Sequence, residues 1–183
     1  MAHGDVLSVD AKAVKIRLIL LDVDGVLTDG MVEIFGDGSE SKRFAIRDGI
    51  ALVWAQRSGI RVGLLSARHS PTTEARAKQL GITLIQQGVK SKAEAFDQIV
   101  GDLVLNDDQV AYMGDDIVDL AVLKRAGLSS APADAVAEVR ARVDFVATQP
   151  GGGGAVRELV ELILKAQRRW DAVVAAYENE GRQ

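Results

Sequence analysis

The segment DVDGVLTDG at residues 22–30 holds the densest group of side chains that could carry chemistry. It follows the apolar run IRLILL, which is typical of a strand buried on both faces. Asp22 and Asp24 therefore come where a strand is expected to end, at a spacing that lets both turn toward one ligand. Gly25 permits a tight turn and the close approach of a phosphate or a substrate backbone.

Other polar groups follow three later strand-like runs. Ser66 ends the run RVGLL, and Lys92 opens a helical stretch after the run ITLI. Asp115 and Asp116 follow VAYM, and Asp119 lies one helical turn further. Because open α/β sheets bind ligands at the carboxyl ends of their strands, we expect these acids, the hydroxyl and the ammonium to converge.

Crowded carboxylates need a cation, because like charges in a cleft raise one another's pKa. Oxygen ligands of this kind indicate Mg²⁺, held by the carboxylates of Asp22 and Asp115 and by the main-chain carbonyl of Asp24. Asp22 is the expected nucleophile, forming an aspartyl-phosphate, and Asp24 the expected general acid and base. Ser66 and Lys92 would hold the phosphoryl oxygens.

Taken singly, each of these residues has a simpler role. A strand-end aspartate is more often a turn residue or a helix cap than a nucleophile, and Asp116 would cap its own helix. Ser66 alone would be a cap, Lys92 a surface lysine and Asp29 a turn residue. The joint pattern, with a different polar type at each of four strand ends, is what favours a phosphotransferase.

Composition excludes several other classes of protein. The 183 residues suit one domain over 1–183, with residues 1–14 flexible. The net charge of −4 argues against a nucleic-acid partner, and the absence of cysteine excludes disulfides and thiolate chemistry. Two histidines, His3 and His69, are too few for a histidine-rich zinc site, and a serine triad would depend on His69 alone. No signal peptide or membrane span is found, so we expect a cytoplasmic protein.

Apolar runs alternate with helical patterns along the chain. Strands are expected over residues 16–21, 61–65, 82–85, 110–113, 128–131 and 143–146. Helices are expected over 49–58, 71–80, 92–100, 117–126 and 133–141, with a long C-terminal helix over 155–180. This alternation predicts the α/β class, with a Rossmann-like, doubly wound, mostly parallel sheet and helices on both of its faces.

Two segments stand apart from the alternation. Residues 31–35 and 41–45 flank the turn GDGS, which predicts a β-hairpin between the first strand and the first helix. Four consecutive glycines at 151–154 precede the last helix and suggest a flexible joint.

The sequence resembles the haloacid dehalogenase superfamily, whose four motifs match DVDGVLTDG, LLSAR at 64–68, Lys92 in GVKSK, and GDDIVD at 114–119. More narrowly, it is similar to the family of 3-deoxy-D-manno-octulosonate 8-phosphate phosphatases. That similarity includes FAIRDG at 44–49, where the family usually has asparagine in place of Ala45, and GGGGAVRE at 151–158. The short spacing between motifs leaves no room for a cap domain.

The resemblance implies a Mg²⁺-dependent phosphatase that releases phosphate from a phosphorylated sugar acid of lipopolysaccharide precursor synthesis. It implies a homotetramer in which the hairpin around Gly36 packs against its copies and neighbouring subunits cover the active sites. The glycine amides would face the anionic substrate. Arg68, in place of an acidic residue, favours the octulosonate. The implied substrate contacts are Arg68, Arg76, Ala45, Ile46, Arg47, Asp48, Gly49 and Asp116, with Asp119 in support.

Four alternatives stay open at this point. A nonulosonate 9-phosphate phosphatase belongs to the same family and shares the motifs. A receiver-type phosphoacceptor also uses aspartates, Mg²⁺, a hydroxyl and a lysine, although its acids sit on different strands. The remaining two are a catalytically silent tetrameric scaffold and a phosphomutase, and the missing cap disfavours the mutase because it must shield an intermediate from water.

Overall fold

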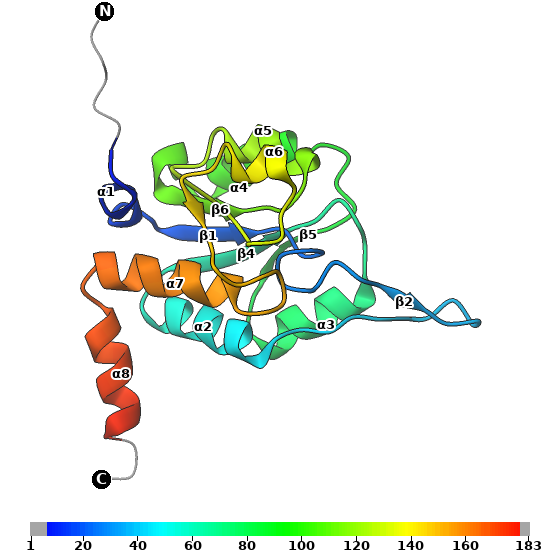
Figure 1. Ribbon diagram of the computed structural model, residues 1–183, viewed down its shortest axis with the longest axis horizontal. Coiled ribbons are helices and arrows are strands. Elements are labelled where there is room, and N and C mark those ends of the chain that lie inside the picture. Colours follow the sequence, from blue (N-terminus) through cyan, green and yellow to red (C-terminus); the bar gives the residue numbers. More distant parts are fainter. Residues whose placement is uncertain (1–6, 180–183) are drawn as a thin grey trace, which may run out of the picture.

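A parallel sheet of six strands forms the centre of the computed structural model, which describes residues 7–179 (Figure 1). The strands are β1 (Leu18–Leu21), β4 (Arg61–Leu65), β5 (Leu84–Gln86), β6 (Val110–Met113), β7 (Leu128–Ala131) and β8 (Phe145–Val146). Their order across the sheet is β5-β4-β1-β6-β7-β8. All neighbours pair in parallel, so the predicted strands and the doubly wound α/β class are confirmed.

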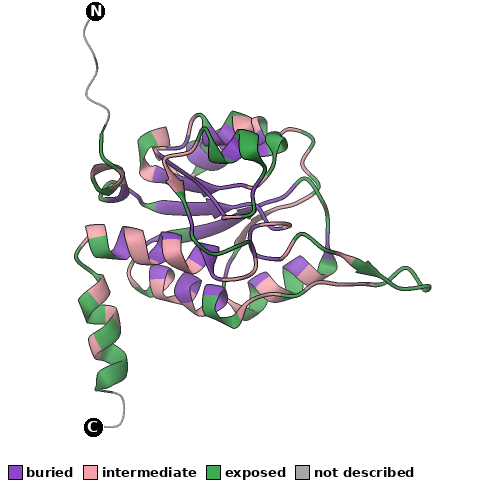
Figure 2. Cartoon of the chain, in the orientation of Figure 1, coloured by how far each residue is buried: buried purple, intermediate pink, exposed green. Residues whose placement is uncertain are grey.

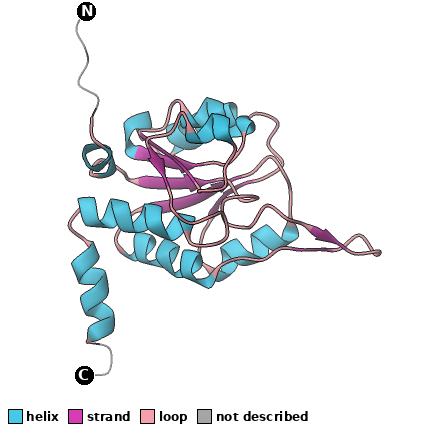
Figure 3. Cartoon of the chain, viewed as in Figure 1, coloured by secondary structure: helices cyan, strands magenta, loops and turns pink. Residues whose placement is uncertain are grey.

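Helices cover both faces of this sheet (Figure 3). One face carries α2 (Ile46–Arg57), α3 (Pro71–Gln79) and α7 (Ala155–Ala166). The other carries α4 (Lys92–Asp102), α5 (Leu120–Leu123) and α6 (Ala137–Arg140). No helix within residues 7–179 is both long enough and apolar enough to span a membrane.

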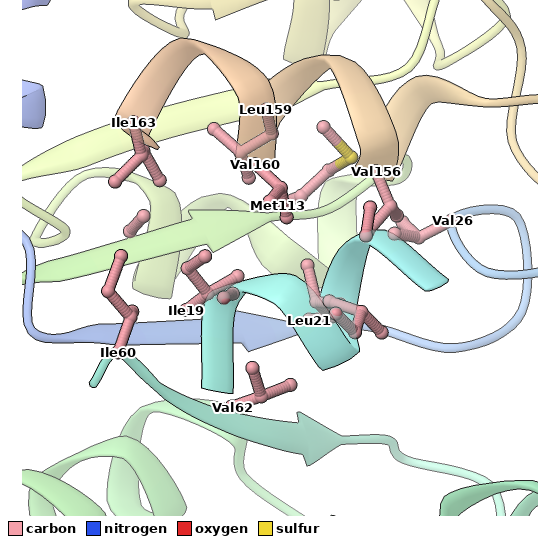
Figure 4. Close-up of a cluster of buried hydrophobic side chains, with 14 of the residues drawn as sticks. Ile19, Leu21, Val26, Ile60, Val62, Met113, Val156, Leu159, Val160 and Ile163 are labelled. Atoms are coloured by element: carbon pink, nitrogen blue, oxygen red, sulfur yellow. The ribbon is translucent and has the colours of Figure 1, made fainter. Parts of the chain in front are cut away.

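Each face of the sheet has its own hydrophobic core, because successive strand residues point to opposite sides. Ile19 and Leu21 of β1 join the core beneath α2 and α7, whereas Leu18 and Leu20 join the core beneath α4 and α5. Burial is concentrated on the strands and on the inner sides of these helices (Figure 2). In Figure 4 the side chains of α7, including Leu159, reach down toward the strands.

The C-terminal helix is not continuous, so the prediction of one helix over 155–180 was wrong. After α7 the chain turns and continues as α8 (Trp170–Glu178), which extends away from the sheet (Figure 1). Arg168 adopts a left-handed φ of 57°, and the amide of Arg169 donates to the carbonyl of Leu164. This is a Schellman ending in which arginine takes the position that glycine usually fills.

Two other helical predictions need correction. The stretch 133–141 is helical only in α6, because the backbone before it bonds elsewhere: the amide of Val136 donates to the carbonyl of Asp115, and that of Ala133 to Gln149. The stretch 117–126 begins as a 3₁₀ turn (Ile117–Asp119) and continues as the short α5. Tertiary hydrogen bonds outweigh alanine's helix propensity in the first case.

The N-terminal segment also differs from the prediction of flexibility over residues 1–14. Residues 1–6, with His3, lie outside the described part of the chain. Beyond them α1 (Val9–Ala13) begins at Ser8, whose hydroxyl accepts a hydrogen bond from the Ala11 amide. Ala13 is fully buried against the core under α7, which ties this helix to the body of the protein.

The predicted hairpin is present and projects from the body (Figure 1). Its strands β2 (Glu33–Ile34) and β3 (Glu40–Ser41) pair antiparallel and form no ladder with the main sheet. Its apolar side chains lie in the open, with Met31 73% and Ile34 70% exposed.

The glycine run at 151–154 is a close-packing element rather than the expected flexible joint. A Cβ on Gly151 would lie 1.9 Å from the carbonyl oxygen of Gly25. The amides of the run bond within the protein: Gly151 donates to Asp134, Gly152 to Val26 and Gly154 to Asp48. The expected presentation of these amides to an anion is therefore not what the structure shows.

Substitution of Gly151 tests this packing. In Gly151→Ala the turn at residues 25–28 must move, and we expect the free energy of unfolding to fall by about 1–3 kcal/mol. Gly101→Ala is the matched control, because Gly101 lies in α4 with open space around it. The control should raise stability by up to about 1 kcal/mol. Urea unfolding measures both, and an unchanged midpoint for Gly151→Ala would contradict the packing argument.

Candidate active site

The polar residues predicted to converge meet at the carboxyl edge of the sheet. Asp22 directly follows the central strand β1, and its amide donates to the carbonyl of Met113 in β6. Carboxylate oxygens of Asp22, Asp115 and Asp119 all lie within 4.8 Å of one another. Strand β1 has neighbours on both sides, so the groups after β4 and β6 flank Asp22.

Lys92 supplies a positive charge to this group of acids. Its Nζ lies 3.0 Å from Asp22 Oδ1 and 2.6 Å from Asp119 Oδ1. Ser91 fixes the start of α4 by accepting the amide of Glu94, so the lysine at the first helical position reaches inward. The simpler interpretation of Lys92 as a surface lysine was wrong, because the residue is buried.

Asp119 supports the site from beneath. Its Oδ1 accepts hydrogen bonds from Lys92 and from the buried Tyr112 hydroxyl, the latter at 2.6 Å. Its Oδ2 accepts the amides of Asp115 and Asp116 at 3.1 and 3.3 Å. Both oxygens are thus engaged by protein donors, which fits the expected supporting role better than a metal ligand.

The electrostatics of the site favour a bound cation. Burial raises the pKa of Asp22 to about 6, with Lys92 opposing the shift and Asp119 adding to it. Burial also raises the pKa of Asp115 to about 7, and the charges of Asp22 and Asp119 add to it. Burial alone would lower the pKa of Lys92, but the charges of Asp22 and Asp119 outweigh burial and raise it. Three carboxylates thus face one ammonium, and the excess negative charge disfavours ionisation.

The donor set fits a hard divalent metal ion. Asp22 and Asp115 offer carboxylate oxygens that the protein does not fully satisfy, and sulfur or imidazole ligands are absent from the group. Gly25 has a φ of +88°, and a Cβ there would lie 2.0 Å from Asp115 Oδ2. Only glycine leaves room for the Asp115 carboxylate in this position.

Asp24 has a partner that the sequence did not reveal. Lys42 Nζ lies 2.6 Å from Asp24 Oδ1, and the two groups form an ion pair. The Lys42 side chain is only 1% exposed. It follows β3 at a position 18 residues from Asp24 in the chain, so no local pattern links the two.

Ser66 and Arg68 lie together at the end of β4. Ser66 is buried, and its Oγ accepts the amide of Arg68 at 3.2 Å. The guanidinium of Arg68 pairs with Glu40 of β3, a carboxylate that also accepts from Ser70. His69, on which a serine triad would depend, is exposed and lies beside Glu74 instead.

Two residues of the expected substrate loop have structural roles. Asp48 is buried and caps α7 from a distance, accepting the amides of Gly154 at 3.1 Å and Arg157 at 2.9 Å. Burial raises the pKa of Asp48, and these amides oppose the shift. Gly49 leaves space for Arg76, whose guanidinium would lie 2.3 Å from a Cβ there. Substrate binding by Asp48 would require the loss of this cap.

The remaining expected contacts are more dispersed. Arg76 donates to the carbonyl of Ala45 at 3.3 Å, so it links α3 to α2. Ile46 is 82% exposed and begins α2, and Arg47 extends over Gly154. Asp116 accepts the Ile117 amide at 2.6 Å, which makes it a local cap at the rim of the acid group. Asp29 accepts the amide of Met31, as a turn residue does.

Comparison with known proteins agrees with this geometry. A family model described as haloacid dehalogenase-like hydrolase matches residues 39–127. The 3-deoxy-D-manno-octulosonate 8-phosphate phosphatase KdsC of Escherichia coli (strain K12) is 43% identical over 161 residues, which cover 88% of this chain and 86% of that protein.

Solved structures show the same similarity. The 3-deoxy-D-manno-octulosonate 8-phosphate phosphatase of Moraxella catarrhalis, in complex with magnesium ion, phosphate ion and a KDO molecule, has a TM-score of 0.90 at 38% identity. The alignment covers 92% of this chain and 97% of that one. The cobalt-bound enzyme of Haemophilus influenzae has a TM-score of 0.84 at 38% identity, covering 87% and 93%. The chain therefore belongs to the 3-deoxy-D-manno-octulosonate 8-phosphate phosphatase family, within the haloacid dehalogenase-like hydrolases.

Proposed function

We propose that this chain hydrolyses 3-deoxy-D-manno-octulosonate 8-phosphate to 3-deoxy-D-manno-octulosonate and phosphate. The observation that carries the proposal is the meeting of Asp22, Asp115 and Lys92 at one sheet edge. Family membership makes the chain a phosphoric monoester hydrolase, which removes the grounds for a receiver module or a silent scaffold. The relatives' names favour the eight-carbon substrate over a nonulosonate 9-phosphate.

Each side chain has a defined task in this proposal. Asp22 attacks phosphorus, and Asp24 gives its proton to the departing sugar oxygen and later takes one from water. Lys92 and Ser66 hold the phosphoryl oxygens and stabilise the charge that develops on them. Asp22 and Asp115 would hold Mg²⁺, which would neutralise negative charge of the phosphate and of the two carboxylates.

Arg68 is the cation that we assign to the carboxylate of the sugar acid. It lies two residues beyond Ser66, its side chain is 41% exposed, and a guanidinium suits bidentate capture of a carboxylate. The pair with Glu40 holds its guanidinium beside the strand β3. Asp48 and Gly49 are engaged elsewhere, so we assign substrate contact in the first turn of α2 to exposed Ile46 and Arg47.

The hairpin supports assembly into the expected homotetramer. Exposed apolar side chains on a two-stranded ribbon are costly in water, and packing against copies of themselves would bury them. Neighbouring subunits could then cover an active site that has no cap domain. The expected cytoplasmic location is kept as part of the proposal, and fractionation of cells would test it.

A panel of phosphate esters tests the substrate. With Mg²⁺ present, octulosonate 8-phosphate should be hydrolysed with a higher kcat/KM than nonulosonate 9-phosphate or hexose phosphates. Asp22→Asn should lower kcat by about a thousand-fold or more, because no other carboxylate can replace the nucleophile. Asp29→Asn is the matched control and should keep activity, since Asp29 serves a turn. Equal rates on simple hexose phosphates would contradict the assigned substrate.

Magnesium binding should depend on pH. Asp22 and Asp115, with pKa values of about 6 and about 7, hold protons that the ion must displace, so affinity rises up to about pH 7. Folding raises both pKa values from the ordinary 3.8. The metal-free protein therefore loses stability as the pH rises from about 4 to about 7. Thermal unfolding should therefore show a larger Mg²⁺-induced rise in Tm at about pH 8 than at about pH 5. A rise independent of pH would argue against these two ligands.

The oligomeric state tests the role of the hairpin. Ile34→Asp places a charge on its exposed apolar surface and should lower the mass measured by light scattering from four chains to fewer. Glu33→Asp, on the neighbouring residue, keeps the charge pattern and serves as the control. A wild-type protein that is monomeric at micromolar concentration would refute the tetramer.

A further inference from the structure

We propose that Lys42 is a positioning residue for Asp24, holding one carboxylate oxygen so that the other meets the leaving group. The inference rests on the proposed function, because it requires Asp24 to act as the general acid and base. It concerns a residue outside the four sequence motifs, in the segment between the hairpin and α2.

Burial makes the pair of Lys42 and Asp24 specific. An ammonium that is removed from water requires a partner, and Lys42 has a side chain only 1% exposed. Within residues 7–179 its ion-pair partner is Asp24 Oδ1 at 2.6 Å, and Thr73 Oγ1 lies further away at 3.4 Å. A lysine on the surface would not require an ion-pair partner in this way, because water solvates and screens its charge.

The two oxygens of Asp24 have different surroundings. Oδ1 is buried beneath Lys42, whereas the side chain as a whole remains 23% exposed. No hydrogen bond to Oδ2 is found within residues 7–179, and because Oδ1 is itself buried, the exposed area belongs to the rest of the side chain. The ion pair therefore fixes the orientation of the carboxyl group and leaves Oδ2 for proton transfer.

The backbone that carries Lys42 is fastened at two points. Glu40 of β3 and Lys42 just after it lie on the same side of the chain, because side chains alternate along an extended segment. Glu40 binds Arg68 and Ser70 beside Ser66, while Lys42 reaches Asp24. Arg43 points the other way, and its 90% exposed side chain pairs with Asp29. Lys42 thus lies in a segment that is tied to the site through both Glu40 and Lys42 itself.

The reaction shows where a displaced Asp24 would matter. In the first step a carboxylate oxygen of Asp22 bonds to phosphorus while the phosphorus–oxygen bond to the sugar breaks. The electron pair of that bond goes to the sugar oxygen, which takes the proton of Asp24 Oδ2. An alkoxide needs this proton, whereas a phenolate of low basicity leaves without it. Misplacement of Asp24 should therefore slow alkyl esters far more than activated aryl esters.

Single-turnover kinetics of Lys42→Met tests the proposal. Release of octulosonate from its 8-phosphate should slow by about 10- to 100-fold, whereas release of p-nitrophenol from its phosphate should change by less than about threefold. Binding of substrate, measured from the concentration dependence, should stay within about twofold of wild type. Arg43→Met is the matched control and should leave both rates unchanged. Arg43 is the neighbouring cationic residue, but it pairs with Asp29 and not with Asp24.

Two further variants separate the possible outcomes. Lys42→Arg keeps the charge and should recover part of the loss on the sugar ester, and it is the variant to use if Lys42→Met fails to fold. In an Asp24→Asn background Lys42→Met should cause no additional loss. Equal slowing of both esters, a pure change in substrate binding, or full additivity with Asp24→Asn would overturn the proposal. If Asp24→Asn itself leaves the sugar ester unaffected, the proposed general acid is wrong, which is a separate failure.

Discussion

The ammonium of Lys92 between Asp22 and Asp119 is the interaction on which the rest of the site depends. Without it three carboxylates would share a poorly solvated edge of the sheet, and their repulsion would keep some of them protonated. With it two negative charges still remain uncompensated, which suits a divalent cation. One carboxylate oxygen of Asp119 accepts a hydrogen bond from Lys92, and the other accepts the amide of Asp115. The role of Asp119 is therefore to position Lys92 and the turn that carries Asp115.

Glycine makes this crowding possible. Cβ atoms at Gly25 and Gly114 would lie 2.0 Å from the Asp115 carboxylate and 2.4 Å from the Asp119 carboxyl carbon. Gly151 lets a distant segment pack directly on the backbone of the 25–28 turn. The carboxylates are therefore held by backbone that comes closer than any side chain would allow, and the glycine-rich sequence of the motifs is a requirement of space.

Sequence patterns predicted the features that depend on local order. Buried strands read as apolar runs, and parallel strands bring their ends together, so Asp22, Lys92 and Asp115 could be assigned to one edge in advance. Features set by tertiary contacts were missed. Asp48 caps a helix that begins over a hundred residues later, and Arg168 ends α7 without the glycine that would have signalled it. The pairing of Lys42 with Asp24 likewise depends on how the hairpin folds back.

That hairpin links two properties that are usually separate. Its outgoing arm carries the exposed apolar side chains of Met31, Ile34 and Phe35, as a surface for assembly would, while the returning arm carries Glu40 and Lys42 into the active site. A displacement of the hairpin would therefore shift Glu40 and Lys42. It would also shift the groups that pair with them, the guanidinium of Arg68 and the carboxyl group of Asp24. In the proposed tetramer, packing of the hairpins against one another would hold two groups in place: the general acid Asp24 and Arg68, which binds the carboxylate of the substrate. Assembly would then complete the active site of each subunit.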